Sequence, residues 1–530
     1  MSRSRSSCTG TRLSRVASDL AKGFEIPIVH VNADDPEACI ECARLAFAYL
    51  NKFGKDFLID LVGYRRHGHN EADEPAFTQP GMYKIIDDHP TVREIWAEEL
   101  ARRNILDKDE ADAIVNKYNE ILHSDFESLT PQDIPEEALS EIPPAGAAQK
   151  TITSVAAETL REMNAALLKL PEGFTINPKL KRARERKENA LADIDEKTID
   201  WAMAEELAFA SILADGTSIR FTGQDAERGT FSHRHAVLHD FQTGETYTPL
   251  QNIPHVKAAF EILNSPLTEN ACIGFEYGYN IQAPDRLVIW EAQYGDFING
   301  AQTIIDEYVV SARAKWGQTP SLVLLLPHAY EGQGPDHSSG RLGRFLDSAG
   351  EINMRIANCT TSAQYFHLLR RQAGVLEIDP LPLIVMTPKS LLRNPLVFSS
   401  LRELSEGTWQ PVIDDGMGAR DAKSVKRLIF CSGKVYIDLS ASELRKQHAK
   451  DVAVARIEQL YPVPTTLIQK VLGRYPNLKE VVWLQEEPEN MGAWMFIYPF
   501  LRKFIKGSVP LHFIGRRRNS SPAEGTASMH

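Results

Sequence analysis

The chain has little cysteine, no long apolar run and no excess of basic residues. Its 530 residues include six cysteines, scattered except for the pair Cys39 and Cys42, a scarcity typical of proteins in a reducing compartment. A run of about 18 consecutive apolar residues is absent, which excludes a membrane-spanning helix. Lys and Arg number 59 against 71 Asp and Glu, a net charge of −12. That acidic balance argues against a protein that coats nucleic acid.

The common short motifs of nucleotide, zinc-protease and serine-hydrolase chemistry are missing as well. The patterns G-x-G-x-x-G, G-x-x-x-x-G-K-[ST], H-E-x-x-H and G-x-S-x-G do not occur, so those classes lose their main support. Cys39 and Cys42 form a C-x-x-C pair, but they fall within a helix predicted over residues 36–51. Thioredoxin-like chemistry needs the pair at a helix start just after a strand, so we interpret both as packing residues.

What is present indicates three strand–helix blocks. Residues 27–31 and 56–62 read as strands around the helix that begins at Pro36, one β-α-β unit of a parallel sheet. A second block combines a helix over 203–212, strands over 219–222, 286–290 and 321–326, and a helix over 299–313. A third has strands over 426–431, 451–455 and 480–484 and helices over 438–447 and 465–474. The pattern predicts an α/β fold with parallel sheets.

Between the first two blocks the sequence predicts helices and linker. Asp107 and Glu110 form a capping box before a stripe of apolar residues, Ala111 to Leu122, and residues 129–148 read as a surface loop. The basic run 179–187 lacks interleaved aromatic residues and reads as a solvated helix face rather than a nucleic-acid patch. The first 18 residues are rich in Arg and Ser like a transit peptide. They show no amphipathic stripe, so we expect a frayed chain start.

Histidine-rich loops are the candidates for chemistry. His67 and His69 follow the second predicted strand, where ligands gather in parallel sheets, and the adjacent Arg65 and Arg66 favour phosphate binding. His233 and His235 would share one face of a strand and could be metal ligands. The intervening arginine would repel a cation, so we favour satisfied or ligand-facing histidines and assign no metal ligand.

Six strings, in this order, resemble the decarboxylating component of 2-oxoglutarate dehydrogenase. They are Val31–Ala38, Tyr64–Pro75, Arg228–Val237, Phe275–Tyr279, Trp290–Phe297 and Glu331–Ser339. The resemblance covers nearly the whole chain but only the later half or so of the family's protein. It implies a transketolase-like thiamine diphosphate-binding fold with a C-terminal α/β domain. The implied limits are 1–85 for the end of the diphosphate-binding domain, 86–200 for a helical connection and linker, 201–389 for the pyrimidine-binding domain and 390–530 for the C-terminal domain.

The resemblance also implies site residues. Glu269 falls where the family places the glutamate that bonds the aminopyrimidine ring, with Glu276 as the nearby competitor. A carboxyl group there can shift the ring toward its imino tautomer, whose nitrogen removes the thiazolium proton. Tyr294 and Phe297 fall where aromatic rings pack on the pyrimidine. His337 matches a histidine near the reacting carbon, and His67 one that reaches the diphosphate.

The implied activity is oxidative decarboxylation of 2-oxoglutarate with thiamine diphosphate and Mg²⁺. The succinyl group would pass to the lipoyl arm of a dihydrolipoyl succinyltransferase, with dihydrolipoyl dehydrogenase in the same complex. The family's metal signature is expected upstream of residue 1, so the chain alone is expected to be an inactive fragment. We expect a homodimer in the bacterial cytoplasm, or in the mitochondrial matrix if the source is eukaryotic. The alternatives are a 2-oxoadipate dehydrogenase, a 2-oxoglutarate decarboxylase, or a non-catalytic dimerising module.

Overall fold

The computed structural model describes residues 17–129, 146–254, 256–414, 422–448, 450–505, 507 and 509–530. The chain divides into two compact units, residues 1–136 and residues 137–530. Most of the expected frayed start, residues 1–16, and most of the expected surface loop lie outside the described residues. Among the helices of the described ranges, none is both long enough and apolar enough to cross a bilayer.

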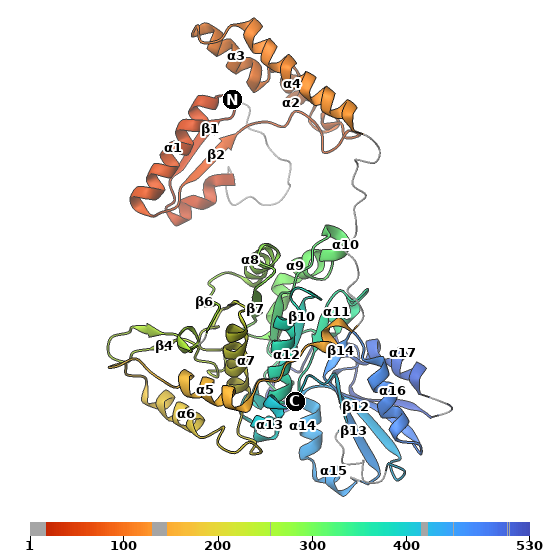
Figure 1. Cartoon of the computed structure of the whole chain (residues 1–530). Helices are drawn as coiled ribbons and strands as arrows, with labels where there is room; N and C mark the ends of the chain where they lie inside the picture. The colour runs from red at the N-terminus through yellow and green to blue at the C-terminus, as the bar shows by residue number, and fades with distance from the viewer. Residues whose placement is uncertain are drawn as a thin grey trace. The chain divides into compact units, whose positions relative to one another are not determined.

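The first unit is built on one β-α-β unit (Figure 1, red). β1 (Ile28–Asn32) pairs in parallel with β2 (Leu58–Val62), and α1 (Pro36–Phe53) connects them. Helix α1 begins where the sequence favours it, because the Asp35 carboxylate accepts the Ala38 N–H and proline fills the first helical position. The predicted β-α-β unit is confirmed, and the C-x-x-C pair lies inside α1 as expected.

Three further helices belong to the first unit: α2 (Pro80–Asp88), α3 (Val92–Arg102) and α4 (Lys108–Ser128). The predicted capping box at the start of α4 is confirmed, since Asp107 and Glu110 each accept the other's backbone N–H. Most of the apolar stripe that follows is exposed: Ile114, Tyr118, Ile121 and Leu122. Helix α4 therefore presents an apolar face that this unit does not cover.

A seven-stranded sheet forms the centre of the second unit, in the order β14-β9-β10-β8-β7-β3-β6. All its neighbouring strands pair in parallel except β14, which runs antiparallel to β9. Its strands are β3 (Ile219–Gly223), β6 (Phe260–Asn264), β7 (Leu287–Glu291), β8 (Val323–Pro327), β9 (Arg355–Ala357), β10 (Leu383–Thr387) and β14 (Gln459–Tyr461). The predicted α/β fold with parallel sheets is confirmed.

Both faces of this sheet are buried, which explains the uninterrupted apolar runs in the sequence. Leu287 and Ile289 of β7 point into a core with α7 (Trp201–Asp215) and α12 (Ser362–Gly374), which lie side by side in Figure 1. The alternate residues of β7 point into a second core, which continues without a break into the C-terminal strands.

The remaining helices surround the sheet or connect its strands, and a small hairpin pairs β4 with β5. They are α5 (Ala157–Leu167), α6 (Pro178–Glu188), α8 (Glu269–Gln282), α11 (Leu342–Asp347) and α13 (Leu401–Ser405), with the hairpin strands β4 (Leu238–His239) and β5 (Thr246–Tyr247). Helix α6 carries the basic run that we expected to be solvated. Two of its residues are exceptions: Arg184 is buried and donates to the Leu167 carbonyl, and Lys187 is half-buried and pairs with Glu206.

The C-terminal part has a five-stranded sheet in the order β11-β13-β12-β15-β16. Its elements, coloured blue in Figure 1 from β12 on, are β11 (Val412–Asp414), β12 (Arg427–Cys431), α14 (Lys434–Ala441), α15 (Glu443–Gln447), β13 (Val452–Ile457), α16 (Thr465–Arg474), β15 (Glu480–Pro488), α17 (Trp494–Phe504) and β16 (Leu511–Arg516). Between β13 and α16 the chain crosses to the larger sheet as β14. This crossing joins the two sheets into one structure.

Three predictions about local structure are wrong in detail. The helix predicted over 299–313 is a series of turns: a 3-10 helix, α9 (Gln302–Ile304), a π-helical turn and α10 (Ala312–Trp316). The wider turn arises because the Val310 N–H bonds to the Ile305 carbonyl. The helix predicted over 438–447 begins at Lys434 and breaks at Ser442.

The third error concerns His233 and His235, which do not share a strand face. The backbone at Ser232 and at His235 has φ of 53° and 50°, in the left-handed region, so this segment is a tight loop.

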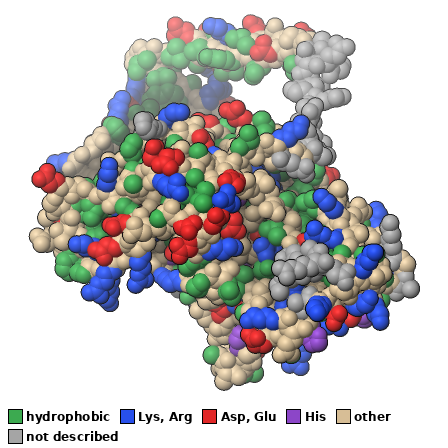
Figure 2. Space-filling model, turned by 60° about the horizontal axis from the view of Figure 1, so that its bottom comes forward, with side chains coloured by type: hydrophobic (Ala, Val, Ile, Leu, Met, Phe, Trp, Pro, Cys, Tyr) green, Lys and Arg blue, Asp and Glu red, His purple; other side chains and the backbone are tan. Residues whose placement is uncertain are grey.

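Figure 2 shows one face of the molecule, on which Lys and Arg side chains lie beside Asp and Glu side chains rather than in a patch of one sign.

Candidate active site

The loops that carry the predicted site residues of the second unit share one edge of its sheet. Strands β3, β6, β7, β8 and β10 run parallel, so the segments that follow them meet at their carboxyl ends. Glu269 begins the helix after β6, Tyr294 and Phe297 follow β7, and His337 follows β8. This is the edge at which parallel sheets bind ligands.

Glu269 is the first residue of α8 and is half-buried, and Thr268 caps the helix. Its carboxylate accepts a hydrogen bond of 3.2 Å from the Gln224 side chain, in the loop after β3. Both residues line a small pocket together with Trp290, Glu291 and Gln293 of the β7 end. The carboxylate thus lies among several polar side chains at the carboxyl edge of the sheet.

Glu276, the competing glutamate, is committed to an ion pair. It is 1% exposed, and both its oxygens accept from the Arg220 guanidinium of β3, at 2.8 and 3.0 Å. This hydrogen bonding, together with the charge of Glu276, raises the pKa of Arg220. Of the two carboxylates, Glu269 is therefore the one that is not committed to an ion pair.

Tyr294, Phe297 and His337 form one aromatic group. The His337 ring stands edge-on to Tyr294 with centroids 4.4 Å apart, and Phe297 lies 5.9 Å from Tyr294 and 6.0 Å from His337. Phe231 adds a further edge contact to Tyr294 at 5.6 Å. The loops after β3, β7 and β8 thus contribute rings to a single cluster.

Glycine makes this close arrangement possible at one position. A Cβ atom at Gly295 would lie 2.6 Å from the Pro327 carbonyl oxygen and 2.7 Å from the Gly340 Cα. The next residue, Asp296, is 2% exposed and accepts the backbone N–H groups of Ser338 and Ser339 at 2.8 and 2.7 Å. The loop after β7 is thereby tied to the segment that carries His337.

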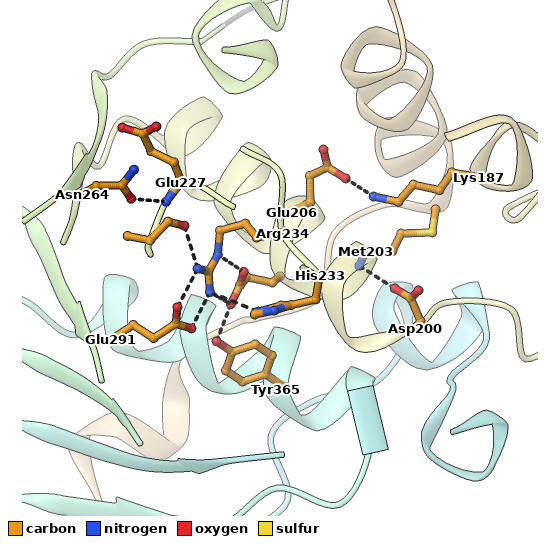
Figure 3. Close-up of polar contacts among 12 residues, drawn as sticks. Lys187, Asp200, Met203, Glu206, Glu227, His233, Arg234, Asn264, Glu291 and Tyr365 are labelled. Atoms are coloured by element: carbon orange, nitrogen blue, oxygen red, sulfur yellow. Dashed lines mark hydrogen bonds and ion pairs between the residues drawn. The ribbon is translucent and has the colours of Figure 1, made fainter. Parts of the chain in front are cut away.

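A buried charge network around Arg234 lies next to the site, because it includes Glu291 of the Glu269 pocket (Figure 3). Arg234 donates to both oxygens of Glu291 at the end of β7 and to both oxygens of Glu205 on α7, at 2.6 to 3.2 Å. Tyr365 of α12 donates to Glu205 at 2.7 Å, and Arg234 also bonds the Ala226 carbonyl at 2.9 Å. Arg234 thus links the loop after β3 to α7 and to the end of β7, and Glu205 extends the network to α12.

The pKa values of Glu205 and Glu291 are shifted in opposite directions. Burial acts to raise the pKa of Glu205, but the charge and hydrogen bonds of Arg234 outweigh it and the pKa is lowered. Burial raises the pKa of Glu291, and repulsion from Glu205 and Asp225 adds to this increase. Because Arg234 has only one charge, Glu291 is the member of the pair that more readily takes up a proton.

His233 lies beside this network, and Figure 3 shows its ring next to the Arg234 guanidinium. Burial and the Arg234 charge lower the pKa of His233 to about 3. Its imidazole is therefore neutral near neutral pH. Gly229, with φ of 76°, leaves space for this ring, because a Cβ there would lie 2.5 Å from its Cε1.

His67 lies in the first unit, in the exposed loop after β2. The Arg66 beside it donates to the backbone carbonyls of Ile86 and His89 and to the Tyr64 hydroxyl. Arg66 therefore ties the loop to α2 rather than pointing at a free site. Within the described part of the chain, no three His, Cys, Asp or Glu side chains are grouped so that they could hold a metal ion.

Sequence reasoning missed the charge network and Lys389. Two acids, Glu205 and Glu206, interrupt the apolar sequence of α7, and Glu291 ends an apolar strand. Such isolated acids in apolar segments signal a buried charge that needs a counter-charge. Lys389 follows the equally apolar β10 and is 3% exposed.

Three family models match the chain. They are dehydrogenase E1 component at residues 7–137, transketolase pyrimidine-binding domain at 197–395 and 2-oxoglutarate dehydrogenase C-terminal at 398–530. Curated relatives include the 2-oxoglutarate dehydrogenase E1 components of Bacillus cereus (strain AH820) and Bacillus anthracis. Each is 51% identical over 528 residues, which are 98% of this chain and 55% of the relative. The chain thus spans about half the length of the curated relatives it matches.

Proposed function

Because the chain belongs to the family of 2-oxoglutarate dehydrogenase E1 components, we propose that it takes part in the oxidative decarboxylation of 2-oxoglutarate. Its role would be to hold the pyrimidine side of thiamine diphosphate and to handle protons there. The observation that carries the proposal is that Glu269, Tyr294, Phe297 and His337 all follow strands at the carboxyl edge of one sheet.

The residues of this edge fit the cofactor's chemistry. Thiamine diphosphate, when bound, supplies a nucleophilic carbon and an electron sink. Glu269 has a half-buried carboxylate in a pocket, suited to exchange a proton with an aminopyrimidine. Tyr294 and Phe297 offer ring faces and edges to a planar ligand, and His337 lies against Tyr294, where it can exchange a proton with a substrate.

The remaining assignments rest on the family alone. His67 would contact the diphosphate, and Mg²⁺ would take its ligands from residues other than those described here. The succinyl product would pass to the lipoyl arm of a dihydrolipoyl succinyltransferase, with dihydrolipoyl dehydrogenase as the later partner. We propose that the enzyme is a homodimer, as the family resemblance of its sequence implies, and that it acts in the cytoplasm, since the relatives named above are bacterial.

A second candidate is a non-catalytic module that dimerises through this unit. It is one of the alternatives that the sequence leaves open, and turnover of a 2-oxo acid separates it from the enzyme. A relative that acts on 2-oxoadipate, or one that releases a semialdehyde, would present the same residues.

Two proteins separate these candidates. The first is the 530-residue chain, and the second is a chimera that joins it to the part of the Bacillus cereus relative that the match leaves uncovered. Each is assayed for CO₂ release from 2-oxoglutarate and 2-oxoadipate, with thiamine diphosphate, Mg²⁺ and an artificial electron acceptor. We expect the chimera to turn over 2-oxoglutarate faster than 2-oxoadipate. We expect the 530-residue chain alone to be inactive. A folded chimera that turns over neither acid would refute the proposal that the chain is part of an enzyme and would support the non-catalytic dimerising module.

A further inference from the structure

Lys389 is a buried cation that contacts the segment carrying His337. It follows β10 and is 3% exposed. Its ammonium group donates to the side-chain oxygen of Gln333 at 2.6 Å and to the backbone carbonyl of His337 at 2.5 Å. Hydrogen bonds from a charged donor are among the stronger ones in proteins. Lys389 therefore holds this segment at two points, one of which is the backbone of His337 itself.

The segment between β8 and α11 has no regular structure that would fix His337. Its backbone enters the left-handed region at Gly332 and Gly334, with φ of 73° and 88°. Besides Lys389, side chains that contact it include Asp296 at Ser338 and Ser339, Ser390 at Glu331, Glu486 at Tyr330 and Glu487 at His328. A segment of this kind takes its shape from side-chain contacts, so the loss of one contact should change it.

The surroundings of Lys389 keep a charge there tolerable. Burial lowers the pKa of Lys389, while the carboxylates of Glu331, Glu486 and Asp296 oppose that effect and Lys434 adds to it. Glu486 comes from β15, and its carboxylate accepts the N–H of Tyr330 at 3.2 Å. The three carboxylates and the two hydrogen bonds of Lys389 thus offset the cost of burying its amine.

We propose that Lys389 is a positioning residue, which holds the His337 imidazole against Tyr294 by fixing the His337 backbone carbonyl. Its meaning for catalysis rests on the proposed function, in which His337 exchanges a proton with the substrate. The geometry itself does not depend on that function. It predicts that removal of the amine loosens the His337 segment and moves its ring away from Tyr294.

The test uses the 530-residue chain without cofactor, with Lys389→Met and the matched control Lys187→Met. Lys187 is a half-buried lysine of the same unit that pairs with Glu206 at 2.7 Å (Figure 3). Two readouts are needed: amide hydrogen exchange at Ser338 and Ser339, and the NMR resonance of the His337 ring in histidine-labelled protein. Loss of a charge-assisted hydrogen bond should speed exchange by about 10- to 100-fold.

We expect Lys389→Met to accelerate exchange in this segment and to shift the His337 resonance, and Lys187→Met to do neither. A folded Lys389→Met with an unchanged His337 resonance and unchanged exchange overturns the proposal. If Lys389→Met does not fold, the decision passes to Lys389→Gln, which keeps a polar group but loses the charge and the length that reach the His337 carbonyl. A shifted His337 resonance in that variant supports the proposal and an unchanged one overturns it. Neither readout requires turnover, so failure here is distinct from failure of the proposed reaction.

Discussion

Replacing Arg234 by methionine should cost this protein more stability than almost any other single change at the site. The side chains of Arg234, Glu205 and Glu291 are 5%, 3% and 8% exposed. Methionine fills a similar volume but leaves both carboxylates buried without a counter-charge. Removal of one partner of a buried ion pair typically costs about 3–5 kcal/mol. Two carboxylates lose the same partner here, so we expect a loss in the upper part of that range.

The loss should depend on pH in a defined direction. Without Arg234, burial raises the folded-state pKa of both carboxyl groups above the unfolded value. The native state then binds more protons than the unfolded state, so stability falls as the pH rises through that interval. Arg234→Met should therefore be less impaired near about pH 5 than near about pH 8. The double variant Arg234→Met/Glu291→Gln should recover part of the loss, because it buries one fewer charge.

Urea unfolding followed by fluorescence, with hydrogen exchange along α7, measures this loss. Arg228→Met is the matched control, since Arg228 lies in the same loop but is 52% exposed in its side chain and pairs with Asp225 at the surface. Surface pairs contribute about 0–1 kcal/mol, so the control should hardly change. A loss below about 1 kcal/mol in Arg234→Met would refute the buried-network reasoning.

Three further changes have defined outcomes. Burial raises the pKa of Glu486 to about 7, so the native state binds a proton there and stability falls as the pH rises from about 4.5 to about 7. Glu486→Gln should therefore reduce the difference in Tm between acid and neutral pH, and an unchanged difference would contradict this. Gly229→Ala should destabilise by at least about 1 kcal/mol, because it strains a left-handed residue and meets the His233 ring; a Tm equal to wild type would show that the loop adapts. Glu276→Gln should cost about 1.5–3 kcal/mol in urea unfolding through lost bonds to Arg220, and a neutral result would mean that Glu276 is free for another role.

Elements that are determined by residues close together in the sequence could be predicted. The strand predicted over 321–326 appears as β8, shifted by two residues at its start, because both faces of the strand are buried and its sequence is uniformly apolar. The start of α1 was predictable from Asp35 and Pro36, whose capping roles depend only on neighbouring residues. The helix predicted over 465–474 has the predicted limits.

Features that depend on distant residues were not predictable. Arg234 was interpreted as an obstacle to a metal, although it binds Glu205 and Glu291, which lie 29 and 57 residues away in the sequence. No local pattern indicates such partners. The strand predicted around His233 fails because backbone hydrogen bonds from Arg234 and His235 to the Arg228 carbonyl close this segment into a tight loop. The domain limits near residues 85, 200 and 390 stay predictions, and so do the roles of the site residues.

The central claim is that Glu269, rather than Glu276, exchanges a proton with the cofactor. The most direct test is hydrogen–deuterium exchange at the thiazolium carbon of thiamine diphosphate bound to the chimera, in wild type, Glu269→Gln and Glu276→Gln. Proton-transfer assistance contributes on the order of 10² to 10⁴ in rate, so Glu269→Gln should slow exchange by that factor while the cofactor still binds. Glu276→Gln should exchange at the wild-type rate per bound cofactor. Wild-type exchange in Glu269→Gln with collapsed exchange in Glu276→Gln would contradict the assignment.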